Sequence, residues 1–391
     1  MSSSDAKRFR VFVLGAGFSH AAGLPLGAEL WNEVRHLARR RHGESNIIEH
    51  ELEGYLEYLE RTEGRAPVAD EVDYEQFLGF LDLEHVLGFR GSKEDTSEGN
   101  GAQLTIKRLI GEVLVDRAPA DATQIPHVYR DFASRLCTSD WVLSFNYDTL
   151  LEQALDAVGK PYRLFQNRMT YVNPKLGTGT ADSSRDELVL LKLHGSIDWF
   201  DKTPYDEAKI AVSTAGVGLE PHGYGHFHPD SRLVLHPLLE GPQFPDDPML
   251  SLYRMKNYRE YYRQAYVPQA PFILAPSSAK LLYSGTLRPL WWGIGRAGGM
   301  NLGLSIIGYS VPYHDEHARR ALYSLASNYT SFGPDFEIAG VRKLPLRIVN
   351  LASTPDAVDG FRKSYQFIDW QKAEVWLEGF TERALDFLFA E

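Results

Sequence analysis

The chain has 391 residues, of which 43% are hydrophobic and 24% are charged, and its formal net charge at pH 7 is -11. This length allows two or three domains and a sizeable hydrophobic core. The negative charge argues against a general surface for nucleic acids or anionic membranes, so we expect no direct nucleic-acid binding.

The chain contains a single cysteine, Cys137. One cysteine excludes an internal disulfide and a zinc site built from several thiolates. We interpret Cys137 as a small buried residue near a helix end. The residues before the first strand lack the apolar core of a signal peptide, and no apolar run approaches the roughly 18 residues of a membrane span. We therefore expect a soluble, cytoplasmic protein with no membrane partner.

The first structural signal is a short strand that runs into a glycine turn. Residues 11–14 read Val-Phe-Val-Leu, and Gly15-Ala16-Gly17 follows directly, before a helix start that includes Ser19. In such a strand–turn–helix unit the backbone N–H groups can approach a pyrophosphate while the helix dipole favours its negative charge. We predict that the backbone of Gly15, Ala16 and Gly17 holds a pyrophosphate, with Ser19 as a further donor.

A long run of helices follows this strand. Apolar residues recur at helical spacing, whereas the glycine-bearing stretch 91–101 is typical of a loop. The predicted domain covers residues 8–391, with a helical module over residues 28–137 inserted within it. The predicted helices are 26–62 (two helices), 73–90, 102–117 and 124–137.

Strands and helices then alternate to the end of the chain, which favours a parallel sheet covered on both faces. The predicted fold is therefore α/β, with a Rossmann-like, doubly wound, mostly parallel sheet. Residues 159–187 are rich in turn signals, and 201–230 form a predicted long loop. The further predicted strands are 141–145, 188–193, 232–235, 272–275, 302–307 and 346–350. The further predicted helices are 147–158, 250–266 (rich in tyrosine), 281–294 (which includes Trp291), 316–327 and 372–389.

Polar residues and glycines stand where several of these strands end. Ligands of doubly wound sheets bind at the carboxyl ends of the strands, so we expect these residues to converge on one site with the glycine turn. Besides the turn, they are Asn146, Asp148, His194, Gly308, Ser310 and Asn350.

These elements resemble the sirtuin superfamily, and most closely its bacterial, NAD-hydrolysing branch of antiviral defence. Gly15 through Pro25 matches the family pattern Gly-Ala-Gly-x-Ser-x-x-x-Gly-[Leu/Ile]-Pro. Asn146-Tyr-Asp148 is similar to the family's Asn-x-Asp element, and His194-Gly195 to its His-Gly element. Gly308-Tyr-Ser310 and Asn350 resemble the elements that face the adenosine half of NAD in sirtuins.

Two departures from the family pattern bear on the expected activity. A single cysteine cannot supply the four-cysteine zinc ribbon of the family's protein deacylases, and Leu26-Gly27-Ala28 replaces their Asp-Phe-Arg. The resemblance therefore implies NAD as a substrate, with no metal, and hydrolysis of NAD rather than deacylation of a peptide.

The implied reaction releases nicotinamide and ADP-ribose through an oxocarbenium-like centre. Because the pyridinium leaving group is already cationic, this reaction needs a fixed ribose, a placed water and a base more than it needs a strong acid. We assign ribose and water positioning to Asn146. The imidazole of His194 can engage ribose hydroxyls or take the proton of the water. Asp148 orients the turn or a ribose hydroxyl.

Other readings of the same residues stay open. Gly15-x-Gly17 also fits a Rossmann oxidoreductase, although His20 stands where a third glycine is expected. Asn146 and Asp148 could cap the following helix. NAD-dependent deacylation, ADP-ribosyl transfer to protein, and non-catalytic sensing of NAD or ADP-ribose are the alternative functions.

Two further features are interpreted structurally. The histidines of the 201–230 loop (His222, His226 and His228, with His236 nearby) have no spacing typical of a metal site. We interpret Trp291-Trp292 and the tyrosines of 253–266 as core or subunit interface.

The resemblance also implies a setting. Relatives of this kind form large homo-oligomers or pair with a separately encoded HerA-type ATPase, and they deplete NAD in abortive infection once activated. The helical module and the 201–230 loop are the segments that we expect to make such contacts.

Overall fold

The computed structural model describes residues 9–89, 91, 99–216, 221, 223–264, 269–275, 283–312, 315–331, 337–338 and 341–390. Its centre is a seven-stranded sheet in the order β14-β13-β10-β1-β2-β6-β3, in which every neighbouring pair is parallel. This confirms the predicted doubly wound α/β fold. The strands are β1 (Arg10–Leu14), β2 (Trp141–Ser144), β3 (Tyr162–Arg163), β6 (Leu188–Lys192), β10 (Gly303–Ile307), β13 (Leu346–Val349) and β14 (Ala373–Trp376).

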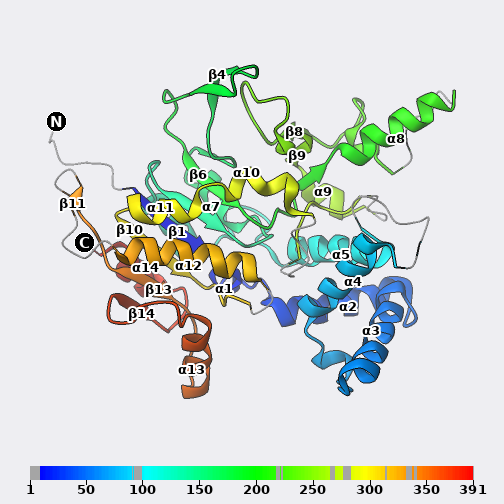
Figure 1. The fold of residues 1–391 in the computed structure, drawn as a ribbon, viewed down its shortest axis with the longest axis horizontal. Helices are drawn as coiled ribbons and strands as arrows, with labels where there is room; N and C mark the ends of the chain where they lie inside the picture. The colour runs from blue at the N-terminus through cyan, green and yellow to red at the C-terminus, as the bar shows by residue number, and fades with distance from the viewer. Residues whose placement is uncertain are drawn as a thin grey trace.

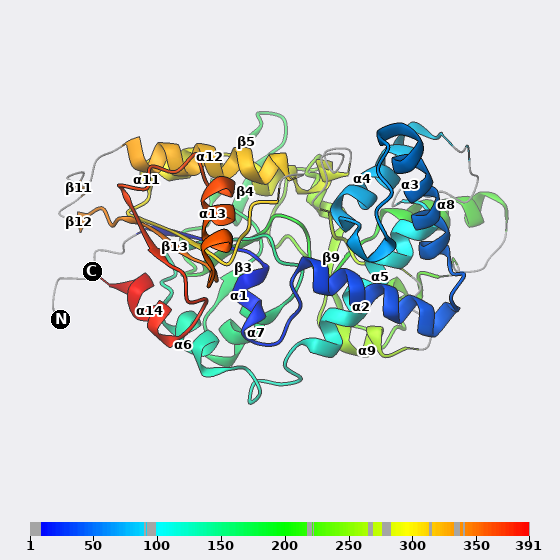
Figure 2. The same cartoon turned by 90° about the horizontal axis from the view of Figure 1, so that it is seen from below.

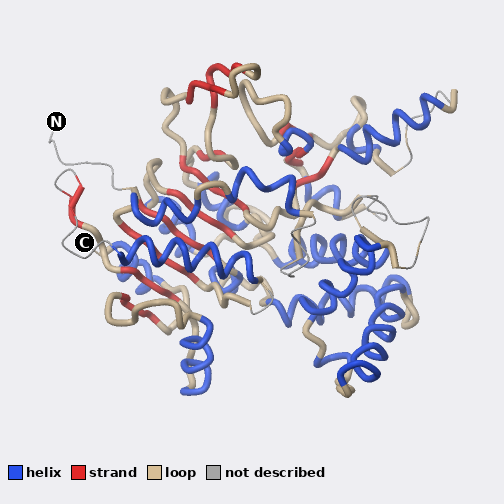
Figure 3. The backbone as a smooth tube through the Cα atoms, in the orientation of Figure 1, coloured by secondary structure: helices blue, strands red, loops and turns tan. Residues whose placement is uncertain are grey.

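Helices cover both faces of this sheet (Figures 1 and 3). One layer holds α11 (Ile294–Met300) and α12 (Glu316–Ser331), and the opposite layer holds α6 (His127–Arg135), α7 (Leu150–Ala157) and α14 (Glu382–Phe389) (Figure 2). Because both faces are covered, β6 and β10 are buried along their whole length.

Four helices gather at one end of the molecule (Figure 2): α2 (Gly27–His42), α3 (Ile47–Glu63), α4 (Tyr74–Leu87) and α5 (Gly101–Arg117). Asn46 caps α3 and Asp73 caps α4 through side-chain oxygens, and Gly64 and Gly88 end these helices in the left-handed conformation. The fifth helix of the predicted 28–137 module, α6, packs on the sheet instead, where Phe132 meets Phe12.

The remaining elements are short. They are α1 (Ala16–His20), α8 (Thr203–Thr214), α9 (Tyr258–Tyr262), α10 (Arg288–Trp291) and α13 (Pro355–Ser364), with the strands β4 (Met169–Asn173), β5 (Thr178–Ala181), β7 (Trp199–Asp201), β8 (Leu235–Pro237), β9 (Leu252–Met255), β11 (Glu337–Ile338) and β12 (Val341–Arg342). Single 3₁₀ turns lie at Ala69–Glu71, Gly225–Phe227, Pro248–Ser251 and Ser284–Leu287.

Several predicted elements were wrong. The described part of the predicted helix 250–266, residues 250–264, forms a turn, β9 and α9 instead of one helix, because β9 pairs with β7 and β8. The predicted loop 201–230 contains α8, and the predicted helix 372–389 begins with β14. The predicted strand 272–275 is reduced to a bridge between Ile273 and Gly195.

Three further predictions concern Cys137, the loop 91–101 and membrane-spanning helices. Cys137 is exposed rather than buried. Most of the predicted loop 91–101 lies outside the described residues. In the described part of the chain, no helix has the length and apolar character that crossing a membrane requires.

The central strands β1 and β10 end in two turns that touch through glycines. The N–H of Gly15 donates to the carbonyl oxygen of Ile307 (3.0 Å), and the N–H of Gly17 donates to that of Gly308 (2.8 Å). A Cβ atom at Gly17 would lie 2.8 Å from the Gly308 Cα atom, and one at Gly308 would lie 2.2 Å from the Phe18 nitrogen. Gly308 also has a φ of 61°. No side chain fits at either position without moving backbone.

We predict that Gly308→Ala lowers the free energy of unfolding by about 2–4 kcal/mol, because it combines a positive φ with a backbone clash. Urea denaturation measures the change. The control is Gly360→Ala in α13, where a Cβ atom meets nothing within 4 Å and where alanine should stabilise the helix by about 0.5–1 kcal/mol. A Gly308→Ala protein as stable as the wild type would contradict the proposed constraint.

Candidate active site

The carboxyl ends of β1, β2, β6 and β10 enclose a cavity of about 130 Å³. The chain adds strands on one side of β1 first and on the other side later, so β1 and β10 flank the point where the strand order reverses. Ligands of doubly wound folds bind at this point. The lining comprises Ala16, Ser19, Leu24, Pro25, Gly27, Leu30, Tyr74, Glu75, Leu114, Phe145, Asn146, Tyr147, Asp148, His194, Tyr309, Ser310 and Pro312.

Asn146 joins the end of β2 to the turn after β1. Its side-chain Nδ2 donates to the carbonyl oxygen of Gly15 (3.0 Å) and to Ser19 Oγ (3.1 Å). Asn146 is 8% exposed and Ser19 is 1% exposed, so these bonds are formed away from water. The amide of Asn146 is thereby held in one orientation at the cavity wall.

His194, at the end of β6, contacts a buried carboxylate. Its Nε2 lies 3.0 Å from Asp315 Oδ2, and Asp315 is fully buried. The hydroxyl of Tyr309 donates to the same oxygen (3.2 Å), while Asp315 Oδ1 accepts the backbone N–H of Ala318 (3.1 Å). One carboxylate therefore caps α12 and orients the imidazole.

Sequence reasoning missed Asp315. An Asp that directly precedes a helix is typical of an N-cap, and this signal could have predicted its bond to the Ala318 N–H. The pairing with His194 depends on how β6 and α12 meet in space, which the local sequence does not encode.

Asp148 lines the cavity, and its Oδ1 accepts the backbone N–H of Leu150 (2.9 Å) at the start of α7. Its carbonyl oxygen accepts a hydrogen bond from Lys192, which also pairs with Glu152 (2.8 Å). Lys192 is 1% exposed, and burial raises the pKa of Glu152 although Lys192 opposes this shift. These contacts attach the segment that carries Asn146 and Asp148 to β6 and α7.

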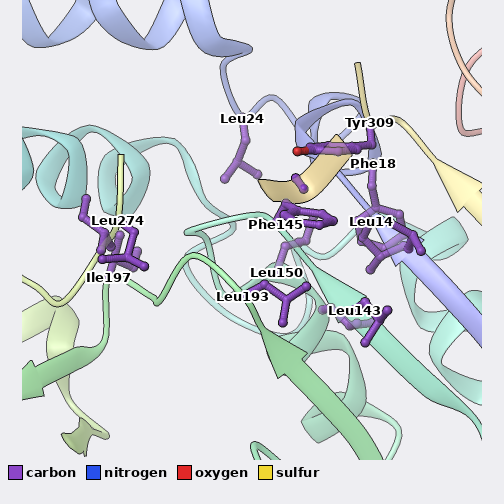
Figure 4. Packing of buried hydrophobic residues seen from close by; sticks show 14 of the residues in the cluster. Leu14, Phe18, Leu24, Leu143, Phe145, Leu150, Leu193, Ile197, Leu274 and Tyr309 are labelled. Atoms are coloured by element: carbon purple, nitrogen blue, oxygen red, sulfur yellow. The ribbon is translucent and has the colours of Figure 1, made fainter. Parts of the chain in front are cut away.

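Aromatic rings form one wall of the cavity. Phe145 stacks on Tyr309 with ring centroids 4.3 Å apart, and the ring of His194 meets Phe145 edge-on at 5.0 Å. Figure 4 displays Phe145 and Tyr309 face to face, with Leu24 nearby. Burial raises the pKa of Tyr309 well above its ordinary value, so its phenol stays protonated. This wall keeps the imidazole in apolar surroundings.

The predicted role of the glycine turn needs correction. The N–H groups of Gly15 and Gly17 already donate to the end of β10, so they cannot bind a pyrophosphate as well. Ala16 and Ser19 are the members of the turn that line the cavity. The two glycines, with Gly308, instead allow the turns to approach each other.

The two predicted elements late in the chain, Gly308-Tyr-Ser310 and Asn350, differ in their position relative to the cavity. Ser310 lines the cavity, whereas Gly308 and Asn350 are not part of its lining. The backbone of Asn350 is instead hydrogen-bonded at the end of β14. Its N–H donates to the carbonyl oxygen of Trp376 (2.8 Å), and its carbonyl oxygen accepts the N–H of Gly379 (2.9 Å). Of the predicted residues, the structure thus brings together Ala16, Ser19, Asn146, Asp148, His194 and Ser310.

The helical module closes this cavity from one side. Tyr74 and Glu75 come from α4, Leu114 from α5, and Gly27 and Leu30 from α2. Pockets for small organic ligands commonly measure about 300–1,000 Å³, so 130 Å³ accommodates a fragment the size of one ring.

The fold defines a doubly wound α/β protein with a cavity at its strand ends. A family model described as SIR2-like domain matches residues 140–215, the segment that contains Asn146, Asp148 and His194. This segment is therefore similar to the SIR2-like domain, a family whose members are NAD-dependent enzymes. No curated protein matches the chain.

The histidines near residue 226 form no metal site in the described part of the chain, where no group of three or more His, Cys, Asp or Glu could hold an ion. His222 lies outside the described residues. His226 is 4% exposed among Phe200, Phe227 and Tyr261, and its Nε2 bonds Gln269 Oε1 (2.8 Å). Burial lowers the pKa of His226 to about 4, so it is a neutral core residue at physiological pH.

We predict that His226 makes the protein less stable in acid. A histidine in the unfolded chain titrates near pH 6.5, so between pH 6.5 and 4 the unfolded state binds more protons than the folded state. Stability is therefore lost as the pH falls through this window, by up to about 3 kcal/mol.

Urea denaturation of His226→Leu at several pH values should give a flatter dependence between pH 6.5 and 4 than the wild type. His236→Leu, which replaces an exposed histidine, serves as the matched control and should keep the wild-type slope. Equal slopes for wild type and His226→Leu would refute this assignment.

Proposed function

We propose that this chain is an NAD⁺ glycohydrolase, which cleaves the bond between nicotinamide and ribose to give nicotinamide and ADP-ribose. The observation that carries the proposal is the meeting of Ser19, Asn146 and His194 at one strand-end cavity, with His194 backed by the buried carboxylate of Asp315. The family match over residues 140–215 supports NAD as the substrate.

The chemistry that we assign follows from the bond that is broken. Loss of nicotinamide leaves an electron-poor ribose carbon, which a water molecule then attacks. Asn146, held by Gly15 and Ser19, positions the ribose and the water. The imidazole of His194 takes the proton that the water releases, and Asp315 stabilises the resulting positive charge.

Phe145 and Tyr309 support this assignment by excluding bulk water from the imidazole. In such apolar surroundings the attraction between an imidazolium and the Asp315 carboxylate is stronger than at a water-exposed surface. We therefore assign the nucleophile to a single water molecule that His194 activates, rather than to bulk water.

We extend the proposal to the biological setting that the sequence resemblance implies. The resting protein is held inactive and depletes NAD in antiviral defence after activation, as a homo-oligomer or with a HerA-type ATPase. The small cavity beneath Tyr74 and Glu75 favours a resting state that does not admit the whole dinucleotide.

The first test is a chromatographic assay of NAD products, with and without co-expressed neighbouring proteins. We expect equal amounts of nicotinamide and ADP-ribose, without any acylated peptide. Asn146→Ala and His194→Ala should each reduce turnover by roughly 10²–10⁴-fold, as expected for loss of a positioning group or a general base.

His236→Ala, at an exposed histidine outside the cavity lining, is the control and should cleave NAD at the wild-type rate. Undiminished turnover in both site variants would reject the assignment of the residues. Binding of NAD without cleavage under all conditions would favour a sensor, and nicotinamide release that requires an acyl-lysine peptide would favour a deacylase.

A second prediction concerns Asp315. Asp315→Asn should keep the cap of α12, because Asn is also a good N-cap residue, but it removes the charge that faces His194. We expect kcat to fall by roughly tenfold or more, with KM and the thermal unfolding temperature close to those of the wild type. A kcat equal to the wild-type value would show that His194 does not depend on this carboxylate.

A further inference from the structure

A second cavity, of about 540 Å³, lies beside α10, α11 and the first half of α12. These three helices lie over the same face of the sheet (Figure 1). The cavity shares no lining residue with the strand-end cavity. Its lining comprises Leu274, Ser284, Gly285, Arg288, Trp291, Ile294, Gly295, His317, Arg320, Ala321 and Ser324.

The charged side chains of this lining are basic. Arg288 and Arg320 enter it from two different helices, and its described residues include no carboxylate. In the part of the chain that the structure describes, neither arginine forms an ion pair or a side-chain hydrogen bond. Two guanidinium groups over one cavity, without a carboxylate partner among the described residues, attract an anion even in a chain of net charge -11.

The kind of anion follows from the rest of the lining. Guanidinium groups bind phosphate oxygens through paired N–H donors, and the hydroxyls of Ser284 and Ser324 offer further polar contacts. Trp291, with Leu274 and Ile294, supplies an aromatic and aliphatic surface on which a ring can pack. A bare phosphate would leave this surface and most of the volume unused.

The size of the cavity supports an organic ligand. Its 540 Å³ falls within the range of about 300–1,000 Å³ for small-molecule sites, whereas the strand-end cavity does not reach that range. This second cavity is therefore large enough for a ring and a phosphate together without movement of the backbone.

We propose that this cavity is a separate binding site for a small organic phosphate that carries an aromatic ring, such as a nucleotide. Arg288 and Arg320 bind the phosphate, and Trp291 packs against the ring. Trp291 also packs against Phe145 (6.1 Å) and His194 (6.4 Å), so one side chain contacts both the proposed ligand and the wall of the strand-end cavity.

Calorimetric titration of the full chain with AMP tests this site. We expect AMP to bind, with adenosine and inorganic phosphate each binding at least about tenfold more weakly, because each lacks one half of the recognised chemistry. Equal affinity for adenosine and AMP, or no binding of AMP at millimolar concentration, would overturn the proposal.

Variants locate the site. Arg288→Gln and Arg320→Gln should each weaken AMP binding by roughly tenfold or more, as expected for the loss of a charged hydrogen bond. Both side chains are exposed, so neither change should prevent folding. Arg296→Gln is the matched control, since Arg296 is an exposed arginine of α11 outside the lining, and it should bind AMP like the wild type.

Asn146→Ala separates the two cavities. If AMP occupies the second cavity, this variant retains wild-type affinity whether or not the chain cleaves NAD. AMP binding that is lost in Asn146→Ala and retained in both arginine variants would place the nucleotide at the strand ends and reject a second site.

Discussion

The contact between the turns after β1 and β10 is the constraint on which the site depends. Gly17 and Gly308 lie so close that neither can carry a side chain, and the Gly17 N–H donates to the Gly308 carbonyl oxygen. This contact places Tyr309 beside Phe145. The carbonyl of Gly15, in the same turn, accepts from Asn146, so the aromatic wall and the amide are both positioned by the glycine contact.

The polar groups around the cavity are fixed by one another across the strands. A buried polar group is costly unless it is hydrogen-bonded, and here Asn146 is satisfied by the β1 turn and His194 pairs with Asp315. The side chain of Lys192 donates a hydrogen bond to the carbonyl oxygen of Asp148. Since each partner comes from a different element, loss of one residue leaves another buried group unpaired.

The sequence predicted the central strands well because their signal is local. β1, β2, β6, β10 and β13 are apolar runs that end in polar or glycine residues, as expected for strands covered on both faces. β9 was missed because its apolar and tyrosine residues lie within a stretch of helical spacing, and pairing with β7 and β8 overrides that preference.

The site was predictable only in part, because its strand ends have a local sequence signal whereas its tertiary contacts do not. Asn146, Asp148 and His194 could be placed at strand ends from the pattern alone, and they line one cavity. The Asp315–His194 pair and the use of the Gly15 and Gly17 amides within the protein are tertiary contacts between distant segments. A motif indicates which residues a turn contains, but the neighbouring turn decides which of its N–H groups stay available.

The same constraint determines where the strand-end cavity can open. The sheet side cannot widen without breaking the Gly17–Gly308 contact and the buried bonds of Asn146 and His194. The opposite side is formed by residues of α2, α4 and α5, among them the carboxylate-bearing Glu75 of α4. In the proposed function, this carboxylate repels the diphosphate of the substrate, so admission of the dinucleotide depends on displacement of these helices while the sheet holds the reactive groups in place.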